Sequence, residues 1–321
     1  MLFVFDLSKP LDFFPIYSNP IPLENFNKFG ITHLERAIDT ITTINPETNF
    51  LVVENIEKST FDYPPYVREI LFIKEELNLF EKLFLISSFI TSCTNETKVI
   101  FLKGNIIIEK IENFFKTIKK ILSSHSNYTL PVIFFSFKNE IKNSFLEIAD
   151  IIEKNEKESF YLVKDILKII DPQKKNKNLL NFCEVFYFHA LKLKEIFCRE
   201  KESSEIYFEC EEMWNKKTFY LEEWNKIIGN IKSLEIKTKI LSEGVVATNI
   251  ESEAGIIEKI RDLFKIFNSD ENNNLIKGKV IYNNLKNSIV INESNSELYI
   301  SNMSDVLVLK NEQLSRIEKL L

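Results

Sequence analysis

Glycine is the residue that this 321-residue sequence most clearly lacks, with only six copies along the chain. Soluble proteins usually contain about 7% glycine. Loops that wrap phosphate groups need glycine because their backbone N–H groups must approach the ligand closely, often with a positive φ angle. A chain so poor in glycine therefore has few places where a phosphate-binding loop of that kind can form.

The sequence also lacks long apolar runs, closely spaced cysteines and an excess of basic residues. Asp6 and Lys9 interrupt the first apolar segment too early for a signal peptide, and no run reaches the ~18 apolar residues of a membrane span, so we expect a cytoplasmic protein that binds no membrane. The four cysteines form no CxxC pair, which argues against a zinc site or a disulfide framework. The net charge of -6, with both signs interspersed, gives no basic stripe for nucleic acid.

Apolar segments typical of strands alternate with amphipathic segments typical of helices over the first half of the chain. The patterns predict strands at 2–5, 50–53, 99–102 and 131–135, and helices at 33–44, 76–92 and from Ile111 to Leu122. Such alternation predicts an α/β fold with a largely parallel sheet and helices on both faces. From about 150 to 265 the predicted helical share rises, with a strand that runs into a helix over 180–197.

The last part of the sequence has a different pattern. Short apolar strands are predicted at 280–282, 288–291, 297–300 and 306–309, separated by Asn, Ser and Lys turns. This spacing indicates a small all-β module, either a sandwich or a solenoid of short coils. The polar stretch 268–274 marks the boundary, so we predict one domain over 1–267 and a second over 268–321.

Several segments resemble bacterial mannose-1-phosphate guanylyltransferases, also called GDP-mannose pyrophosphorylases, in order and spacing. They are GITHLERAIDTI, VIFLKGNIII followed by ENFFKTIKKIL, FYFHALKLKEIF and NNNLIKGKVIYNNLKNSIVINESNSELYISNMSDVLVLKN. The resemblance implies a Rossmann-like nucleotidyltransferase domain with a mixed, mostly parallel sheet, followed by a short C-terminal left-handed β-helix-like module. It also implies that a sugar 1-phosphate reacts with a nucleoside triphosphate to give a nucleotide sugar and pyrophosphate, with Mg²⁺ held by two acidic residues.

The family's glycine-rich phosphate loop matches residues 7–15, where its glycines are absent. Ser8 and Lys9 stand in the glycine-rich part, and Asp12 replaces the arginine that would meet the triphosphate. A carboxylate at that point repels phosphate instead of attracting it. The lysine of the family's next signature is replaced by Leu23. Lys9 is therefore the only cation left in the loop.

The other signatures that the resemblance assigns to chemistry are retained only in part. Asn78 is the one residue kept from the base-binding motif, and it is either a base contact or a helix N-cap. The two metal-binding carboxylates match Asn105 and Glu253, which are either residual Mg²⁺ ligands or ordinary loop residues. The family's Trp-Asn-Ser-Gly matches 181–184, so that Glu184 stands in the position of the glycine.

Two hypotheses for the function follow from this selective loss. In the first, the chain is a catalytically disabled paralogue with a regulatory or structural role, without a cofactor, acting as a homo-oligomer or paired with an active homologue. In the second, it is a divergent but active sugar-1-phosphate nucleotidyltransferase that binds Mg²⁺, GTP and mannose 1-phosphate. Losing one group that stabilises a transition state typically costs about 10²-fold or more in rate. Because several such groups are absent, we favour the first hypothesis.

Overall fold

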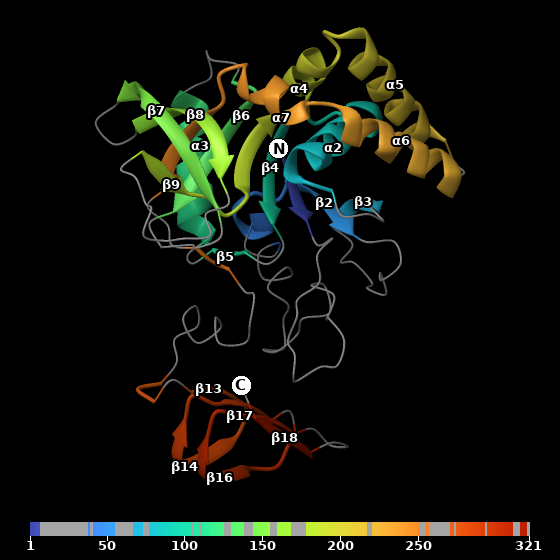
Figure 1. Ribbon diagram of the computed structural model, residues 1–321. Coiled ribbons are helices and arrows are strands. Elements are labelled where there is room, and N and C mark those ends of the chain that lie inside the picture. The colour runs from blue at the N-terminus through green and yellow to red at the C-terminus, as the bar shows by residue number, and fades with distance from the viewer. Residues whose placement is uncertain are drawn as a thin grey trace.

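The computed structural model shows a large α/β body followed by a set of short C-terminal strands (Figure 1). Its described residues are 1–6, 38, 41–54, 67–72, 77–103, 106–108, 111–124, 130–137, 144–154, 159–167, 178–216, 220–250, 254–256, 270–272, 274–292, 294–310 and 315–319. None of the helices within these ranges is long and apolar enough to cross a membrane.

Ten of the described strands form one large sheet, in the order β3-β2-β1-β4-β10-β6-β11-β8-β7-β9. The strands are β1 (Leu2–Asp6), β2 (Asn49–Glu54), β3 (Val67–Phe72), β4 (Lys98–Lys103), β6 (Val132–Phe137), β7 (Phe145–Lys154), β8 (Ser159–Leu167), β9 (Leu179–Asn181), β10 (Val185–His189) and β11 (Val246–Ile250). Only β8, β9 and β10 run against the direction of β1. The prediction of a mixed, mostly parallel sheet in an α/β fold is confirmed.

Helices cover both faces of this sheet. They are α2 (Leu79–Cys93), α3 (Ile111–Ser124), α4 (Ala190–Phe197), α5 (Lys201–Asn215), α6 (Leu221–Ser233) and α7 (Ile236–Leu241), with further helical backbone at 38 and 41–44. Phe115 of α3 stacks on Phe3 of β1, with 5.7 Å between ring centroids. Leu2 and Val4 instead belong to the apolar cluster that contains α2 and α5. Because successive strand residues point to opposite faces, β1 is buried along its whole length.

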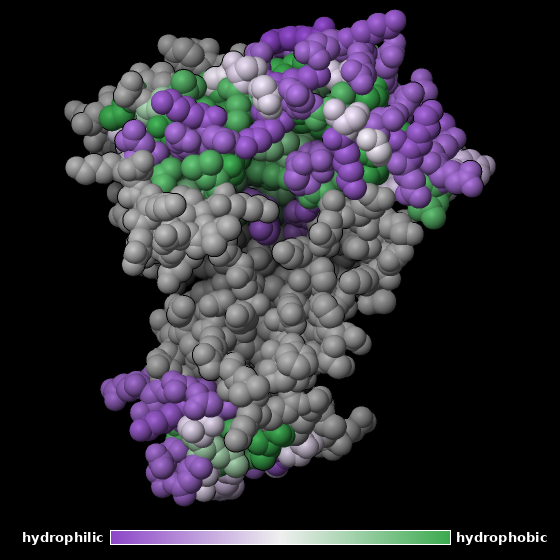
Figure 2. All heavy atoms as spheres, in the orientation of Figure 1, coloured by the Kyte–Doolittle hydropathy of each residue, from purple (hydrophilic) through white to green (hydrophobic). Residues whose placement is uncertain are grey.

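The helices α4 to α7 lie on the same side of the sheet as α2, with α5 and α6 outermost (Figure 1). Their buried residues include Tyr207 and Trp224, both almost fully enclosed. Hydrophilic side chains cover the outer surface of α5 and α6 (Figure 2). These two helices are therefore amphipathic. They account for part of the rise in helical content that the sequence predicts after residue 150.

The segment 145–167 differs from the sequence-based expectation. Instead of extending the helical region, it forms the long antiparallel pair β7 and β8, which adds an edge to the sheet. Apolar residues of β7 recur at Phe145, Ile148 and Ile152, a spacing that also suits a helix. Irregular register with β8 at several points breaks the alternation that would have identified a strand.

The C-terminal strands form two small sheets around an apolar cluster of their own. They are β13 (Leu275–Lys277), β14 (Val280–Lys286), β15 (Ile289–Asn292), β16 (Leu298–Ser304), β17 (Val306–Lys310) and β18 (Ser315–Lys319). Strands β13, β15 and β17 pair in parallel, as do β14 and β16, while β18 is antiparallel to β17. The short strands predicted for this region are confirmed.

Two of the parallel pairs, β14–β16 and β15–β17, have 18 residues between register partners, whereas β13 and β15 are 14 residues apart. The side-chain amide of Asn284 donates to Oδ1 of Asn302, 18 residues later, over 3.0 Å. Both asparagines have positive φ angles, and so do Asn287 and Asp305 with the same spacing. Asparagine and aspartate tolerate this left-handed conformation better than most residues, so the turns between strands recur at equivalent points.

Candidate functional site

Four charged side chains lie where the parallel strands β1 and β4 end. Asp6 ends β1 and Lys103 ends β4, and they are register partners in adjacent strands. Lys82 approaches from α2, and Glu184 directly precedes β10. We call these four residues the charged row. In open α/β sheets, ligands bind outside the carboxyl ends of the strands, so the charged row is the candidate functional site.

Lys82 and Asp6 form the more buried half of the charged row. The distance between Lys82 Nζ and Asp6 Oδ2 is 2.6 Å, and the side chains are only 12% and 3% exposed. Asp6 lies on the same face of β1 as Leu2 and Val4, which is the face that α2 covers. The ion pair therefore ties α2 to the end of the first strand.

Lys103 and Glu184 form the more accessible half. Lys103 Nζ lies 2.8 Å from Glu184 Oε1, and the side chains are 25% and 28% exposed. Glu184 has a φ angle of 57°, in the left-handed region that glycine adopts most easily. That backbone fits the match of residue 184 to a glycine in the resembling family, but here the position carries a carboxylate.

The charges of the row cancel one another, since each lysine donates a hydrogen bond to a carboxylate. An anionic ligand would have to displace one of these carboxylates before it could pair with a lysine. A metal ion would have to displace the lysines from the carboxylates, because Mg²⁺ requires oxygen ligands that are free to coordinate it. Within the described ranges, no three His, Cys, Asp or Glu side chains gather closely enough to hold a metal ion. These residues therefore do not fit a Mg²⁺ site.

Most of the predicted site residues, namely Ser8, Lys9, Asp12, Asn105 and Glu253, lie outside the described residues. The strands that directly follow Asn105 and Glu253 are described, and they pair. β5 (Ile106–Ile108) is antiparallel to β12 (Ala254–Ile256). Because the two strands are antiparallel, their first residues, Ile106 and Ala254, lie at opposite ends of the pair.

Asn78 is described, and its side chain caps α2. Its Oδ1 accepts hydrogen bonds from the backbone N–H of Phe80 (2.9 Å) and of Glu81 (3.0 Å). The side chain of Glu81 accepts one in return from the N–H of Asn78 at 2.8 Å, which completes a capping box. The N-cap role considered from the sequence is confirmed, whereas a base contact by Asn78 stays a prediction.

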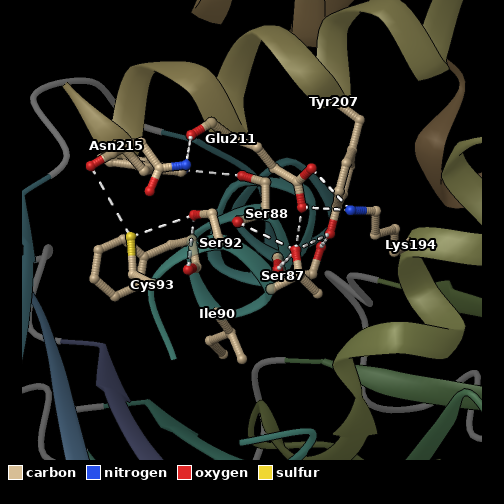
Figure 3. Close-up of polar contacts among 12 residues, drawn as sticks. Ser87, Ser88, Ile90, Ser92, Cys93, Lys194, Tyr207, Glu211 and Asn215 are labelled. Atoms are coloured by element: carbon tan, nitrogen blue, oxygen red, sulfur yellow. Dashed lines mark hydrogen bonds and ion pairs between the residues drawn. The ribbon is translucent and has the colours of Figure 1, made fainter. Parts of the chain in front are cut away.

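A second polar cluster lies between α2 and α5, toward the C-terminal end of α2 (Figure 3). Thr91 donates to Glu211 over 2.6 Å, and Lys194 donates to both carboxylate oxygens of Glu211. The hydroxyl of Tyr207 lies 3.1 Å from Thr91 Oγ1. Because these groups bond mainly to one another, we interpret the cluster as a polar contact among α2, α4 and α5 rather than as a binding site.

Two buried cysteines, Cys210 on α5 and Cys183 beside the charged row, are ordinary packed thiols. Cys210 is fully buried, and burial raises the pKa of its thiol to about 12. Burial also raises the pKa of the Cys183 thiol, next to Glu184. A thiol must ionise to act as a nucleophile or a metal ligand, so neither is suited to that chemistry at neutral pH.

The sequence gives no signal for Lys82. It offers Lys103 as one of several lysines that could bind phosphate, with Lys168, Lys174, Lys175 and Lys177, although a solvent-exposed charged face is the favoured interpretation of these lysines. Lys82 and Lys103 reach partners far along the chain, at separations of 76 and 81 residues. Glu184 carries a different signal, because it replaces a glycine of the resembling family.

No protein-family model and no curated protein sequence matches this chain. Solved structures do match. A mannose-1-phosphate geranyltransferase from Thermus thermophilus aligns with a TM-score of 0.72 at 12% identity, covering 99% of this chain and 94% of that one. A UDP-glucose pyrophosphorylase complexed with UDP-glucose aligns at 0.52 and 10% identity, covering 81% and 94%.

The similar structures also include a mannose-6-phosphate isomerase from Helicobacter pylori, with a TM-score of 0.51 and 12% identity, covering 79% of this chain and 98% of that one. At such low identities the likeness concerns the fold alone. The chain therefore has the Rossmann-like α/β fold of sugar-phosphate nucleotidyltransferases.

Proposed function

We propose that the chain is a catalytically disabled relative of sugar-1-phosphate nucleotidyltransferases, with a regulatory or structural role. The observation that carries the proposal is the internal neutralisation of the charged row. Transfer of a nucleotidyl group needs cations and N–H donors that converge on the triphosphate and stabilise its developing charge. Lys82 and Lys103 stand at the correct edge of the sheet, but both are already bonded to carboxylates.

The sequence supports the same proposal at positions beyond the charged row. Asp12 stands where the resembling family has an arginine, Leu23 where it has a lysine, and Asn105 where it has a metal-binding aspartate. An asparagine oxygen can touch Mg²⁺ but lacks the charge that holds a hard dication. These losses act on the same transition state, so their effects on rate compound even though they do not simply add.

A divergent but active enzyme is the second candidate. Its support is the sequence match that puts Glu253 where the resembling family has its second metal-binding carboxylate. In that case GTP and mannose 1-phosphate would be the substrates. Glu253 would then be the principal acidic residue of the site.

The proposal includes a C-terminal β-helix-like module over 268–321 that mediates association. The parallel register of β13, β15 and β17, and the 18-residue spacing of the pairs β15–β17 and β14–β16, support a solenoid of short coils, which the resemblance implies to be a left-handed β-helix. On β14 and β16, the register partners Ile281 and Tyr299 are 48% and 68% exposed. Large apolar side chains that meet on an open surface are typical of protein contacts.

A second copy of this chain is the occupant that we propose for the Ile281–Tyr299 surface. The exposed residues Lys279 and Glu297 precede the two strands and carry opposite charges. A patch bordered by one cation and one anion is self-complementary under a two-fold axis, because each charge can meet its opposite on the partner.

Two measurements test these proposals. Isothermal titration of GTP with Mg²⁺ into the purified protein should show no binding up to about millimolar concentration. Any binding free energy would then be smaller in magnitude than about 4 kcal/mol. Tight binding would overturn the proposal that the chain is catalytically disabled.

Light scattering should show that the wild-type chain is a dimer. Tyr299→Lys should dissociate this dimer, whereas Tyr220→Lys, at a residue 60% exposed beside α6, should leave it intact. A monomeric wild-type chain would contradict the association proposal.

A further inference from the structure

We propose that Lys103 is a latent anion-binding group and that the carboxylate of Glu184 occupies its site in place of a phosphate-like ligand. The inference rests on the proposed function, in which the charged row binds no triphosphate. It goes further by naming the residue that prevents binding and the class of ligand that would take its place.

The geometry of the pair resembles a ligand contact. Glu184 Oε1 accepts from Lys103 Nζ at 2.8 Å, and both side chains are about one quarter exposed. The pair is therefore partly open to solvent. A carboxylate oxygen and a phosphate oxygen offer a lysine the same kind of charge-assisted hydrogen bond. Lys103 also ends a parallel strand, at the edge of the sheet where ligands bind in such folds.

The backbone explains why Glu184 meets Lys103. The next residue, Val185, is buried and pairs with Leu102 of β4, and the preceding Cys183 is buried as well. These two anchors place residue 184 beside the end of β4. The left-handed conformation is unfavourable for a residue that carries a side chain. Such conformations persist only where the surrounding structure holds them. The buried neighbours Cys183 and Val185 therefore fix the backbone at residue 184 so that the side chain of Glu184 meets Lys103.

Charge determines what would bind if Glu184 were neutral. The row holds two lysines and two carboxylates, so its net charge is zero, and removing the charge of Glu184 makes it positive. Lys82 already neutralises Asp6, which is the register partner of Lys103. A compact anion such as pyrophosphate or the phosphate group of a sugar 1-phosphate would then be attracted to Lys103.

Titration calorimetry with inorganic pyrophosphate, and separately with mannose 1-phosphate, tests the inference. Glu184→Gln removes the charge, while Glu184→Gly also relieves the left-handed backbone, so a folded protein is expected for both. We expect each to bind at least one of the two anions about tenfold more tightly than wild type, the size of one charge-assisted hydrogen bond. The double variant Glu184→Gln/Lys103→Met should return to the wild-type affinity.

The matched control is Glu195→Gln, which breaks the exposed ion pair of Lys192 and Glu195 on α4, where the N–O distance is 2.7 Å. It should leave anion binding unchanged. The inference is wrong if folded Glu184→Gln binds neither anion better than wild type, or if the gain survives in the double variant. Strong GTP binding by the wild type would instead contradict the proposed function. The two failures are therefore distinguishable.

Discussion

Lys82 on α2 donates a hydrogen bond to Asp6 at the end of β1, with 2.6 Å between Nζ and Oδ2. The two side chains are almost completely removed from solvent. A buried charge needs a partner of opposite charge, because burying a carboxylate alone is strongly unfavourable. The pair is therefore a structural constraint on the edge of the sheet as well as part of the charged row.

Lys82→Met should destabilise the fold by about 3 kcal/mol, because it leaves the buried Asp6 without its lysine. Urea denaturation measures the change. The double variant Asp6→Asn/Lys82→Met should recover part of the loss, since it removes both charges. As a control, Lys201→Met affects a well-exposed ion pair with Glu205 and should change stability very little. Equal effects of the two single variants would contradict the burial argument.

Asn78→Ala should lower the stability by about 1 kcal/mol, the usual value of a helix N-cap. Asn78→Asp should retain it, because aspartate also accepts hydrogen bonds from the backbone N–H groups of α2. Thermal denaturation compares the three proteins. A loss of stability in Asn78→Asp as large as in Asn78→Ala would show that the carboxamide does more than cap the helix.

The contact between α2 and α5 depends on Glu211, whose carboxylate accepts from Thr91 and Lys194 (Figure 3). Glu211→Ala should destabilise the protein by about 2 kcal/mol, because both donors lose their acceptor. Glu212→Ala, at an exposed position of the same helix, is the matched control and should have little effect. Urea denaturation distinguishes them, and similar losses would mean that the network contributes little.

His189 gives a prediction for acid conditions. Burial, together with Lys98 and Lys192, holds the pKa of its imidazole below the ordinary value of 6.5, with Glu195 acting in the opposite direction. Because the folded protein then binds a proton less readily than the unfolded chain, this contribution to stability is lost as the pH falls from the unfolded pKa toward the folded one.

The measurement is urea denaturation of wild type and His189→Gln at about pH 7.5 and about pH 5.5, on either side of the histidine pKa. The wild type should lose more stability between the two values than the variant does. Carboxylates contribute equally to both proteins and therefore cancel in the comparison. Identical losses would show that His189 does not contribute to the pH dependence.

The sequence predicted the elements whose pattern is local. The apolar run at 2–5 identified β1, and the periodicity from Phe80 to Ile90 identified α2, because both are buried in the way that their spacing indicates. It did not predict β7 and β8, because their irregular register removes the alternating pattern of a strand. Their strand conformation depends on packing against the rest of the sheet.

The candidate site was less predictable than the fold. The ion pairs of the charged row join residues that are distant in sequence, and no local pattern records such contacts. The positive φ of Glu184 could be expected only from its match to a family glycine, because a glutamate by itself does not indicate a left-handed turn. The functional meaning of Asp12, Asn105 and Glu253 still rests on the family resemblance alone.

Formation of a nucleotide sugar is the most direct test of the central claim. The purified chain should be incubated with Mg²⁺, mannose 1-phosphate and GTP, and then with other sugar 1-phosphates and triphosphates, while pyrophosphate release and product are followed. A disabled nucleotidyltransferase should give no product above the uncatalysed background. Sustained turnover that Glu253→Ala abolishes would contradict the claim and establish the chain as an active enzyme.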